Sequence, residues 1–146
     1  SNLPLDVHLM VKDIKAYIDS FIPYEPNIIT FHIEACKDKE EVFELIKYIK
    51  ENNIKVGISI KPNTKIEEIY EFLPYLSLFL IMTVEPGKGG QKLIPETIDK
   101  ISKLKERPIN KTLPNKYNAS CKLYLSLSPI ITSGNIKANN INVKIR

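Results

Sequence analysis

The sequence predicts an α/β fold in which a parallel sheet is built from about four successive strand–helix units. Four short runs rich in β-branched and aromatic residues alternate with segments of helical periodicity, which is the pattern of βαβ units. The midpoints of these runs, near residues 7, 30, 57 and 80, lie 23 to 27 residues apart. Eight units of that length make a closed (β/α)8 barrel of roughly 200 residues. A chain of 146 residues has room for an incomplete TIM barrel, or an open sheet, followed by an atypical tail.

The first unit combines a strand over residues 5–9 with a helix that ends at Pro23. Proline cannot continue a helix, because it lacks the backbone N–H and clashes with the preceding turn. The apolar face of this helix recurs at helical spacing and consists of Ile14, Tyr17, Ile18, Phe21 and Ile22.

Three further units follow the same pattern. Strands are predicted over residues 28–33, 55–60 and 78–82, where β-branched and aromatic side chains dominate. Each strand precedes a segment whose apolar residues share one helical face. These three faces are formed by Val42, Leu45, Ile46 and Ile49, by Ile66, Ile69 and Leu73, and by Ile98, Ile101 and Leu104.

Charge divides the chain near residue 107. All 17 acidic residues lie between Asp6 and Glu106, whereas residues 107–146 hold basic residues and no acidic one. We expect this last segment to be a basic, irregular tail, with residues 123–127 and 130–132 as its candidate strands. Its bases are sparse and only Tyr117 and Tyr124 accompany them, so the composition argues against a nucleic-acid partner.

Cysteine content and hydropathy limit the cellular compartments in which we expect this protein. The two cysteines, Cys36 and Cys121, lie far apart without further ligand residues at metal-site spacing. Because disulfides are rare in the cytosol, we expect two reduced thiols in a cytoplasmic protein. The most apolar stretch, residues 76–82, is far shorter than the roughly 20 residues of a membrane helix, so no membrane partner is expected.

Residues suited to chemistry follow two of the predicted strands. Parallel barrels place their active sites at the carboxyl ends of the strands. His8 and Met10 stand at the end of the first strand, and Met82 ends the fourth. The loop over residues 87–90 then brings three glycines before a helix. Such a loop is either a plain turn or a cradle in which backbone N–H groups bind a phosphate.

Four segments of the chain resemble the ribulose-phosphate 3-epimerases. The segments are residues 5–11 (LDVHLMV), 29–35 (ITFHIEA), 55–64 (KVGISIKPNT) and 82–91 (MTVEPGKGGQ). They occur in the order of strands 3 to 6 of that family's (β/α)8 barrel, over about residues 3–106. The resemblance implies a metal-dependent isomerase that interconverts ribulose 5-phosphate and xylulose 5-phosphate in the pentose phosphate pathway. It divides the chain into a partial ribulose-phosphate-binding barrel, residues 1–106, and a tail, residues 107–146, that does not match.

The resemblance also implies roles for seven residues. His8 matches a histidine that binds the metal and approaches the substrate. Met10 and Met82 match methionines that line the sugar site, where polarizable sulfur would face an enediolate. The other four match the loop that binds the substrate at its phosphate end, with a lysine in place of the family's usual aromatic residue: Gly87, Lys88, Gly89 and Gly90.

The implied reaction inverts the configuration at C3 of a ketopentose phosphate. A divalent metal (Zn, Fe, Mn or Co) stabilises the enediolate, while two aspartates on opposite faces remove and return the proton. The first aspartate belongs to a strand that precedes the matched segments, and where the second is expected the nearest residue is Ser133. Of four expected metal ligands only His8 is present. We therefore assign no catalytic residue and expect negligible epimerase activity from residues 1–146 alone.

Several alternatives remain open from the sequence. The substrate is a pentulose phosphate or a hexulose phosphate such as allulose 6-phosphate, and the chain is an enzyme fragment, a pseudoenzyme or a partner that completes a barrel. His32 and Glu34 are either a support for the site or a hydrogen-bonded core pair. Lys61 and Thr64 suit a polar barrel rim, and Glu85 lies near the sugar site or in a loop contact. Exposed strand edges of a partial barrel predict homo-oligomers or aggregation.

Overall fold

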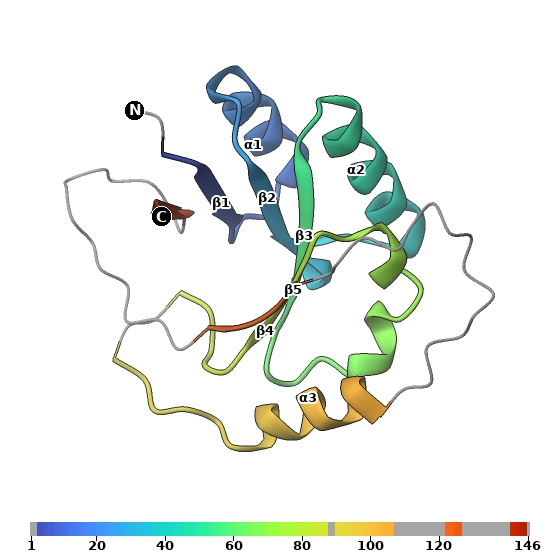
Figure 1. Cartoon of the computed structure of the whole chain (residues 1–146), viewed down its shortest axis with the longest axis vertical. Helices are drawn as coiled ribbons and strands as arrows, with labels where there is room; N and C mark the ends of the chain where they lie inside the picture. The colour runs from blue at the N-terminus through green and yellow to red at the C-terminus, as the bar shows by residue number, and fades with distance from the viewer. Residues whose placement is uncertain (1–2, 88–89, 107–121, 127–140, 146) are drawn as a thin grey trace.

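The computed structural model describes residues 3–87, 90–106, 122–126 and 141–145. It shows a six-stranded sheet in the order β5-β4-β3-β2-β1-β6, with helices packed against it (Figure 1). The strands β1 to β5 run parallel, and β6 is antiparallel to β1. The α/β class and the parallel order of the strands predicted from the sequence are confirmed.

The four predicted strands form where their β-branched runs lie. They are β1 (Leu5–Leu9), β2 (Ile28–His32), β3 (Lys55–Ile60) and β4 (Leu78–Met82). Each pairs with the next in parallel, so that His8 lies opposite Thr30, Thr30 opposite Gly57, and Ser59 opposite both His32 and Leu80. This register brings the carboxyl ends of the strands to one edge of the fold.

Three α-helices connect or follow these strands: α1 (Ile14–Phe21), α2 (Lys39–Glu51) and α3 (Glu96–Glu106). Asp13 and Asp38 cap the first two, each accepting a hydrogen bond from a backbone N–H of the first turn. Pro23 lies in the 3-10 turn η1 (Ile22–Tyr24) just beyond α1, so the predicted end of this helix is confirmed.

The segment after β3 differs from the helix that we predicted over residues 66–73. It forms two 3-10 turns, η3 (Ile66–Ile69) and η4 (Leu73–Tyr75). Pro74 has no backbone N–H to donate, so it favours a short turn over a longer helix. The prediction that Ile66 and Ile69 face the core is nevertheless confirmed, since both side chains are buried.

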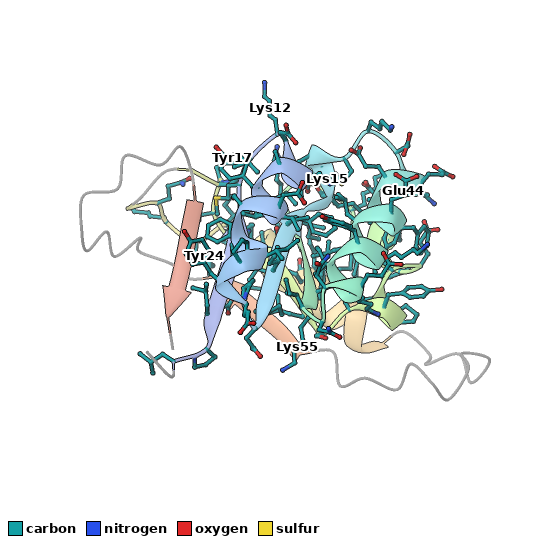
Figure 2. The ribbon with its side chains drawn as sticks, turned by 90° about the horizontal axis from the view of Figure 1, so that it is seen from above. Lys12, Lys15, Tyr17, Tyr24, Glu44 and Lys55 are labelled. Carbon is teal, nitrogen blue, oxygen red and sulfur yellow. The ribbon has the colours of Figure 1, made fainter. Side chains whose placement is uncertain are left out.

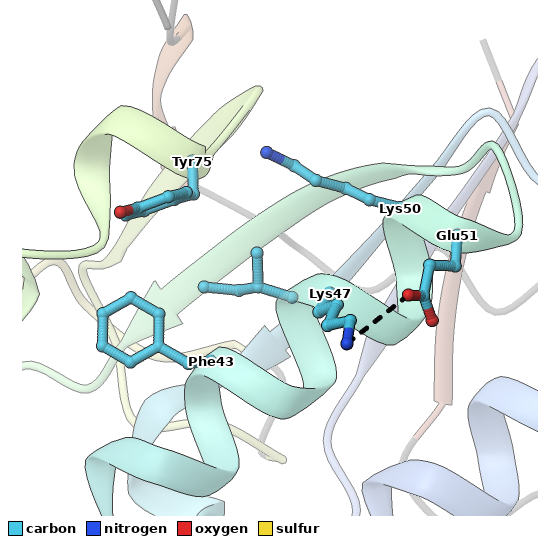
Figure 3. Close-up of a pocket in the computed structure, with 6 residues that line it drawn as sticks. Phe43, Lys47, Lys50, Glu51 and Tyr75 are labelled. Atoms are coloured by element: carbon cyan, nitrogen blue, oxygen red, sulfur yellow. Dashed lines mark ion pairs between the residues drawn. The ribbon is translucent and has the colours of Figure 1, made fainter. Parts of the chain in front are cut away.

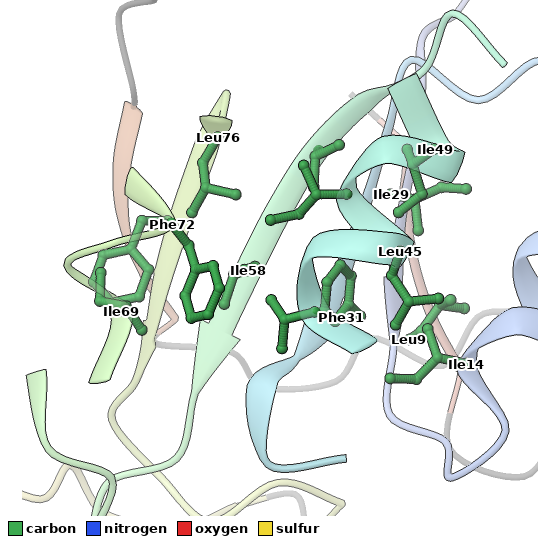
Figure 4. Close-up of a cluster of buried hydrophobic side chains, with 14 of the residues drawn as sticks. Leu9, Ile14, Ile29, Phe31, Leu45, Ile49, Ile58, Ile69, Phe72 and Leu76 are labelled. Carbon is green, nitrogen blue, oxygen red and sulfur yellow. The ribbon is translucent and has the colours of Figure 1, made fainter. Parts of the chain in front are cut away.

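Alternation along the strands gives the sheet two different faces. One face packs against α1, α2 and the 3-10 turns through a continuous apolar core (Figure 4). From the strands it takes every second residue: Val7 and Leu9, Ile29 and Phe31, Val56, Ile58 and Ile60, Phe79 and Ile81. Leu5 packs at the border of this core, and the other residues of β1 to β4 lie on the opposite face, among them His8 and His32.

Two more strands come from the segment that we expected to be irregular. β5 (Lys122–Ser126) pairs in parallel with β4, and β6 (Ile141–Ile145) pairs antiparallel with β1. The first matches the candidate strand over residues 123–127, while the candidate over residues 130–132 lies outside the described residues. β5 and β6 thus cover the edges of β4 and β1, and the sheet ends in β5 on one side and in β6 on the other. We did not predict β6 from the sequence, because the Asn- and Lys-rich sequence around both strands lacks a clear apolar face.

The helix surfaces that point away from the sheet are polar. Lys12 projects outward from the loop before α1, Lys15 from α1 and Glu44 from α2 (Figure 2). Lys15 pairs with Asp19 at 3.0 Å, and the Tyr48 hydroxyl donates to the same carboxylate at 2.6 Å. Among the described helices, none has both the length and the apolar character to cross a bilayer. On α3, Ile98 is 45% exposed, so the buried face that we predicted for this helix is wrong at that residue.

Gly57 is fixed by a close approach between β2 and β3. A Cβ at this position would lie 2.3 Å from Thr30 Oγ1 and 3.2 Å from Leu78 Cδ2. We predict that Gly57→Ala lowers the free energy of unfolding by about 1–3 kcal/mol, because the tightly packed strands cannot separate freely.

A second substitution tests the cause of that loss. Thr30 Oγ1 is buried without a hydrogen-bond partner among the described residues, so its removal costs little by itself. Urea unfolding of Gly57→Ala, Thr30→Ala and the double variant should show that Thr30→Ala recovers part of the stability. Simple additivity of the two changes would contradict the predicted contact.

Candidate functional site

Two histidines and a serine meet on the sheet face that α1 and α2 leave uncovered. His8 comes from β1, His32 from β2 and Ser59 from β3, each near the carboxyl end of its strand. His8 Nε2 lies 3.1 Å from His32 Nε2 and 3.2 Å from Ser59 Oγ. The two imidazole rings are nearly parallel, with an interplanar angle of 18°. We call these three side chains the histidine cluster.

Burial keeps the first imidazole of the histidine cluster neutral. Burial, followed by the neighbouring His32, lowers the pKa of His8 to about 3. Removing a charged imidazolium from water is costly, and a second positive charge beside it adds repulsion. His8 therefore stands at neutral pH as an uncharged ring that can donate at one nitrogen and accept at the other.

A carboxylate follows the histidine cluster at the end of β2. Glu34 belongs to the 3-10 turn η2 (Ile33–Ala35), and its Oε2 lies 3.4 Å from His32 Nδ1. Its Oε1 accepts hydrogen bonds from Lys61 N at 2.6 Å and from the Thr64 hydroxyl. The carboxylate thereby links the end of β2 to the turn after β3.

The same contacts hold Glu34 in its charged form. Burial opposes ionisation, but the contact with His32 and the hydrogen bonds from Lys61 and Thr64 outweigh it and lower the pKa of Glu34 to about 2. Donors directed at a carboxylate favour its charged state. Glu34 is therefore a fixed negative charge beside His32 at neutral pH.

The turn after β3 is held from its other side by α3. The Lys100 ammonium donates to three backbone carbonyls, those of Lys61 at 3.3 Å, Pro62 at 2.6 Å and Thr64. Thr64 is buried while Lys61 is exposed, which agrees with a polar rim at this strand end. Glu34 and Lys100 thus bind the same turn through its donors and its acceptors.

The glycine loop follows β4 and leads toward α3. Gly87 and Gly90 have φ angles of 88° and 69°, in the left-handed region that favours glycine. The Gln91 side chain closes this loop, since it accepts from Glu85 N at 3.3 Å and donates to Glu85 O at 2.6 Å. Glu85 is exposed and takes part in loop contacts through its backbone.

The remaining site residues predicted from the sequence lie at the same strand ends. Met82 ends β4 and is 3% exposed, and Met10 follows β1 and is half-buried. Lys88 and Gly89 lie outside the described residues. The structure therefore places His8 and Met82 at the carboxyl ends of their strands, Met10 just after β1 and the two described glycines in the loop after β4.

The described residues do not form a complete metal centre. Among them, no group of three or more His, Cys, Asp or Glu side chains is arranged to hold a metal ion. A catalytic zinc site usually needs three protein ligands, and a single imidazole does not suffice. The residues present thus do not fit the divalent metal that the resemblance implies, and we derive no step through it.

A groove of about 400 Å³ lies apart from this site, on the helix side of the sheet (Figure 3). It separates α2 from η4 and contains the aromatic pair Phe43 and Tyr75, whose ring centroids are 5.6 Å apart. Lys47 at its border is paired with Glu51 at 3.7 Å. None of the residues suited to chemistry lies in this groove.

Comparison with known proteins shows to which protein family the chain belongs. The model of the ribulose-phosphate 3 epimerase family matches residues 1–123. The chain belongs to this family. The match continues past Glu106, where the motifs recognised in the sequence end, and reaches into β5.

Individual members of the epimerase family support the same conclusion. Ribulose-phosphate 3-epimerase of Helicobacter pylori (strain J99) is 40% identical over 123 residues, which are 84% of this chain and 52% of the relative. The enzyme of that name from Eremothecium gossypii is 40% identical over 102 residues, 70% of this chain and 41% of the relative. The ribulose-phosphate 3-epimerase of Escherichia coli (strain K12) is 39% identical over 104 residues, which are 71% of this chain and 45% of the relative. The chain spans about half the length of the curated relatives it matches.

Ser59 and Lys100 are the site residues that sequence reasoning missed. Ser59 had a visible signal, because it is the one polar residue in the run Val56–Ile60 and shares its face with Gly57. Lys100 had none, since a lysine on a surface helix is ordinary and its carbonyl partners are brought to it only by the fold.

Protonation of Glu34 should weaken the fold in acid. The pKa is lowered from an ordinary value of 4.5 to about 2, so its stabilising effect is complete above pH 4.5 and is lost as the pH falls through 2. We predict that Glu34→Gln lowers the free energy of unfolding at pH 7 by about 1–3 kcal/mol. Urea titrations at pH 7 and pH 2 should show that this difference shrinks in acid, whereas the exposed Glu44→Gln changes little at either pH.

Removal of the Lys100 ammonium should loosen the turn after β3. We predict that Lys100→Met reduces the free energy of unfolding by about 1–3 kcal/mol, because three carbonyls lose their donor. Lys103→Met, on the exposed side of the same helix, is the matched control. Equal midpoints of thermal unfolding for the two variants would show that the contacts do not stabilise the fold.

Proposed function

We propose that this chain supplies part of the active site of a ribulose-phosphate 3-epimerase, the part that binds the sugar phosphate. The observation that carries the proposal is the convergence of His8, His32 and Ser59 at the carboxyl ends of consecutive parallel strands. In (β/α)8 barrels that end of the strands holds the chemistry. Family membership and the printed names of the relatives support the same reaction class, isomerisation of a carbohydrate.

The proposed substrate is ribulose 5-phosphate, exchanged with xylulose 5-phosphate in the pentose phosphate pathway of the cytoplasm. The backbone N–H groups of the glycine loop bind the phosphate, and its left-handed glycines permit their close approach. Met10 and Met82 line the sugar, and His8 faces it as a neutral imidazole. In a complete enzyme, His8 together with ligands from outside the described residues would hold a divalent metal, which would supply electrostatic stabilisation of negative charge.

Proton transfer at C3 needs groups that residues 1–146 do not contain. The two aspartates of the family have no counterpart among the matched segments, and a neutral His8 cannot serve both faces of a carbon. We therefore propose that residues 1–146 bind the sugar phosphate but do not epimerise it alone.

Two measurements on the chain test the proposal. Ribulose 5-phosphate should shift the amide resonances of Gly87 and Gly90 saturably, while ribulose without the phosphate should leave them unchanged. In D₂O with Zn²⁺, Mn²⁺, Fe²⁺ or Co²⁺, the C3 proton of the substrate should not exchange above the background rate. Absence of any saturable shift would contradict the binding role. Exchange that depends on the protein would contradict the need for the missing aspartates.

A further inference from the structure

Three backbone carbonyl oxygens converge on one point beside the turn after β3. The carbonyls of Lys61, Pro62 and Thr64 all accept from the ammonium of Lys100, which reaches them from α3 and is half-buried. Its Nζ lies 3.3 Å from Lys61 O and 2.6 Å from Pro62 O. We call these three carbonyls the carbonyl cage. An ammonium carries three N–H donors, so a single one can satisfy the whole cage.

The carbonyl cage is shaped by contacts that do not involve Lys100. Thr64 N donates to Lys61 O at 3.2 Å and closes the turn. Glu34 Oε1 accepts from Lys61 N at 2.6 Å and from the Thr64 hydroxyl. Pro62 has a fixed φ angle, which limits the backbone further. The turn itself therefore holds the three oxygens together, and we expect the cage to persist when the ammonium is removed.

The charges around the carbonyl cage favour a cation. The carboxylates of Glu34, Glu67 and Glu68 attract the Lys100 ammonium, whereas Lys103 repels it. Carbonyl oxygens accept hydrogen bonds and cannot donate them. Groups of such oxygens also bind potassium, because they replace its hydration shell. Both the ligand atoms and the surrounding charges thus suit a small monovalent cation.

We propose that the carbonyl cage is a binding site for one monovalent cation of the size of ammonium or potassium, and that Lys100 occupies it as a cation tethered to α3. Tethering gives the ammonium a high effective concentration at the cage, so the unaltered chain needs no free ion. An ordinary lysine contact makes no such prediction, whereas a cation site predicts that a free ion can replace the lost ammonium. The proposal is independent of the sugar-phosphate site.

Chemical rescue of Lys100→Ala tests the proposal. Alanine removes the ammonium and leaves space for a free cation. Urea unfolding of the whole chain is measured in ammonium, potassium or tetramethylammonium chloride at equal ionic strength. We expect ammonium and potassium to raise the urea midpoint of Lys100→Ala saturably, as mass action requires for a ligand of the folded state. Tetramethylammonium, which is larger and has no N–H group, should not raise it.

Two further variants separate the carbonyl cage from general effects of salt. In Lys100→Met the new side chain fills most of the space of the lysine stem, so ammonium should not rescue this variant. Lys103→Ala, on the exposed side of the same helix, should have the same midpoint in all three salts. Equal responses of Lys100→Ala and Lys100→Met, or no response of either, would overturn the proposal.

A measurement on the unaltered chain covers the case in which the variants do not fold. With ¹⁵N-labelled lysine and ¹³C-labelled carbonyls, the Nζ resonance of Lys100 should show couplings across hydrogen bonds to the carbonyl carbons of Pro62 and Thr64. Its N–H protons should exchange with water more slowly than those of Lys103. A Lys100 ammonium without such couplings, and with exchange as fast as that of Lys103, would show that the cage does not hold it.

Discussion

The carboxylate of Glu34 is the contact on which the arrangement of the candidate site depends. It lies where β2 ends, receives the backbone N–H of Lys61 and the hydroxyl of Thr64, and faces His32. One side chain thus connects two strand ends and the histidine cluster. Burying a carboxylate is unfavourable unless donors surround it, and here a carboxylate at the end of β2 receives its donors from the turn after β3. The donors reach the carboxylate only when β2 and β3 are correctly paired, so the stability of the charge depends on the assembled sheet.

The parallel register explains why these groups meet at all. Side chains alternate between the two faces of a strand, so a shift by one residue would send His8 into the apolar core and Leu9 to the polar face. The core on the helix side prevents such a shift, because Val7, Ile29 and Phe31 are fully buried there. Stability and chemistry are therefore divided between the two faces, and the apolar face keeps the register that the polar face requires.

Much of this organisation is contained in local sequence. The strands β1 to β4 were predictable because β-branched runs recur at a regular spacing, and Pro23 correctly ended α1. The 3-10 turns were not, since Pro74 changes the geometry without changing the apolar spacing. His8 and His32 were recognisable from their motifs, but their contact with each other and with Ser59 was not, because hydrogen bonds between strands depend on register. Lys100 illustrates the same limit: its carbonyl partners are more than 30 residues away in sequence.

The antiparallel strand β6 has a consequence for how the sheet can grow. It occupies the edge of β1, where a parallel barrel would place a neighbouring strand. Each strand edge offers one row of backbone donors and acceptors, so β6 and a parallel neighbour exclude one another. Completion of a barrel at this edge would be an exchange of one strand for another, with backbone hydrogen bonds broken and formed in similar number. Any strand that completed a barrel at the edge of β1 would therefore have to displace β6.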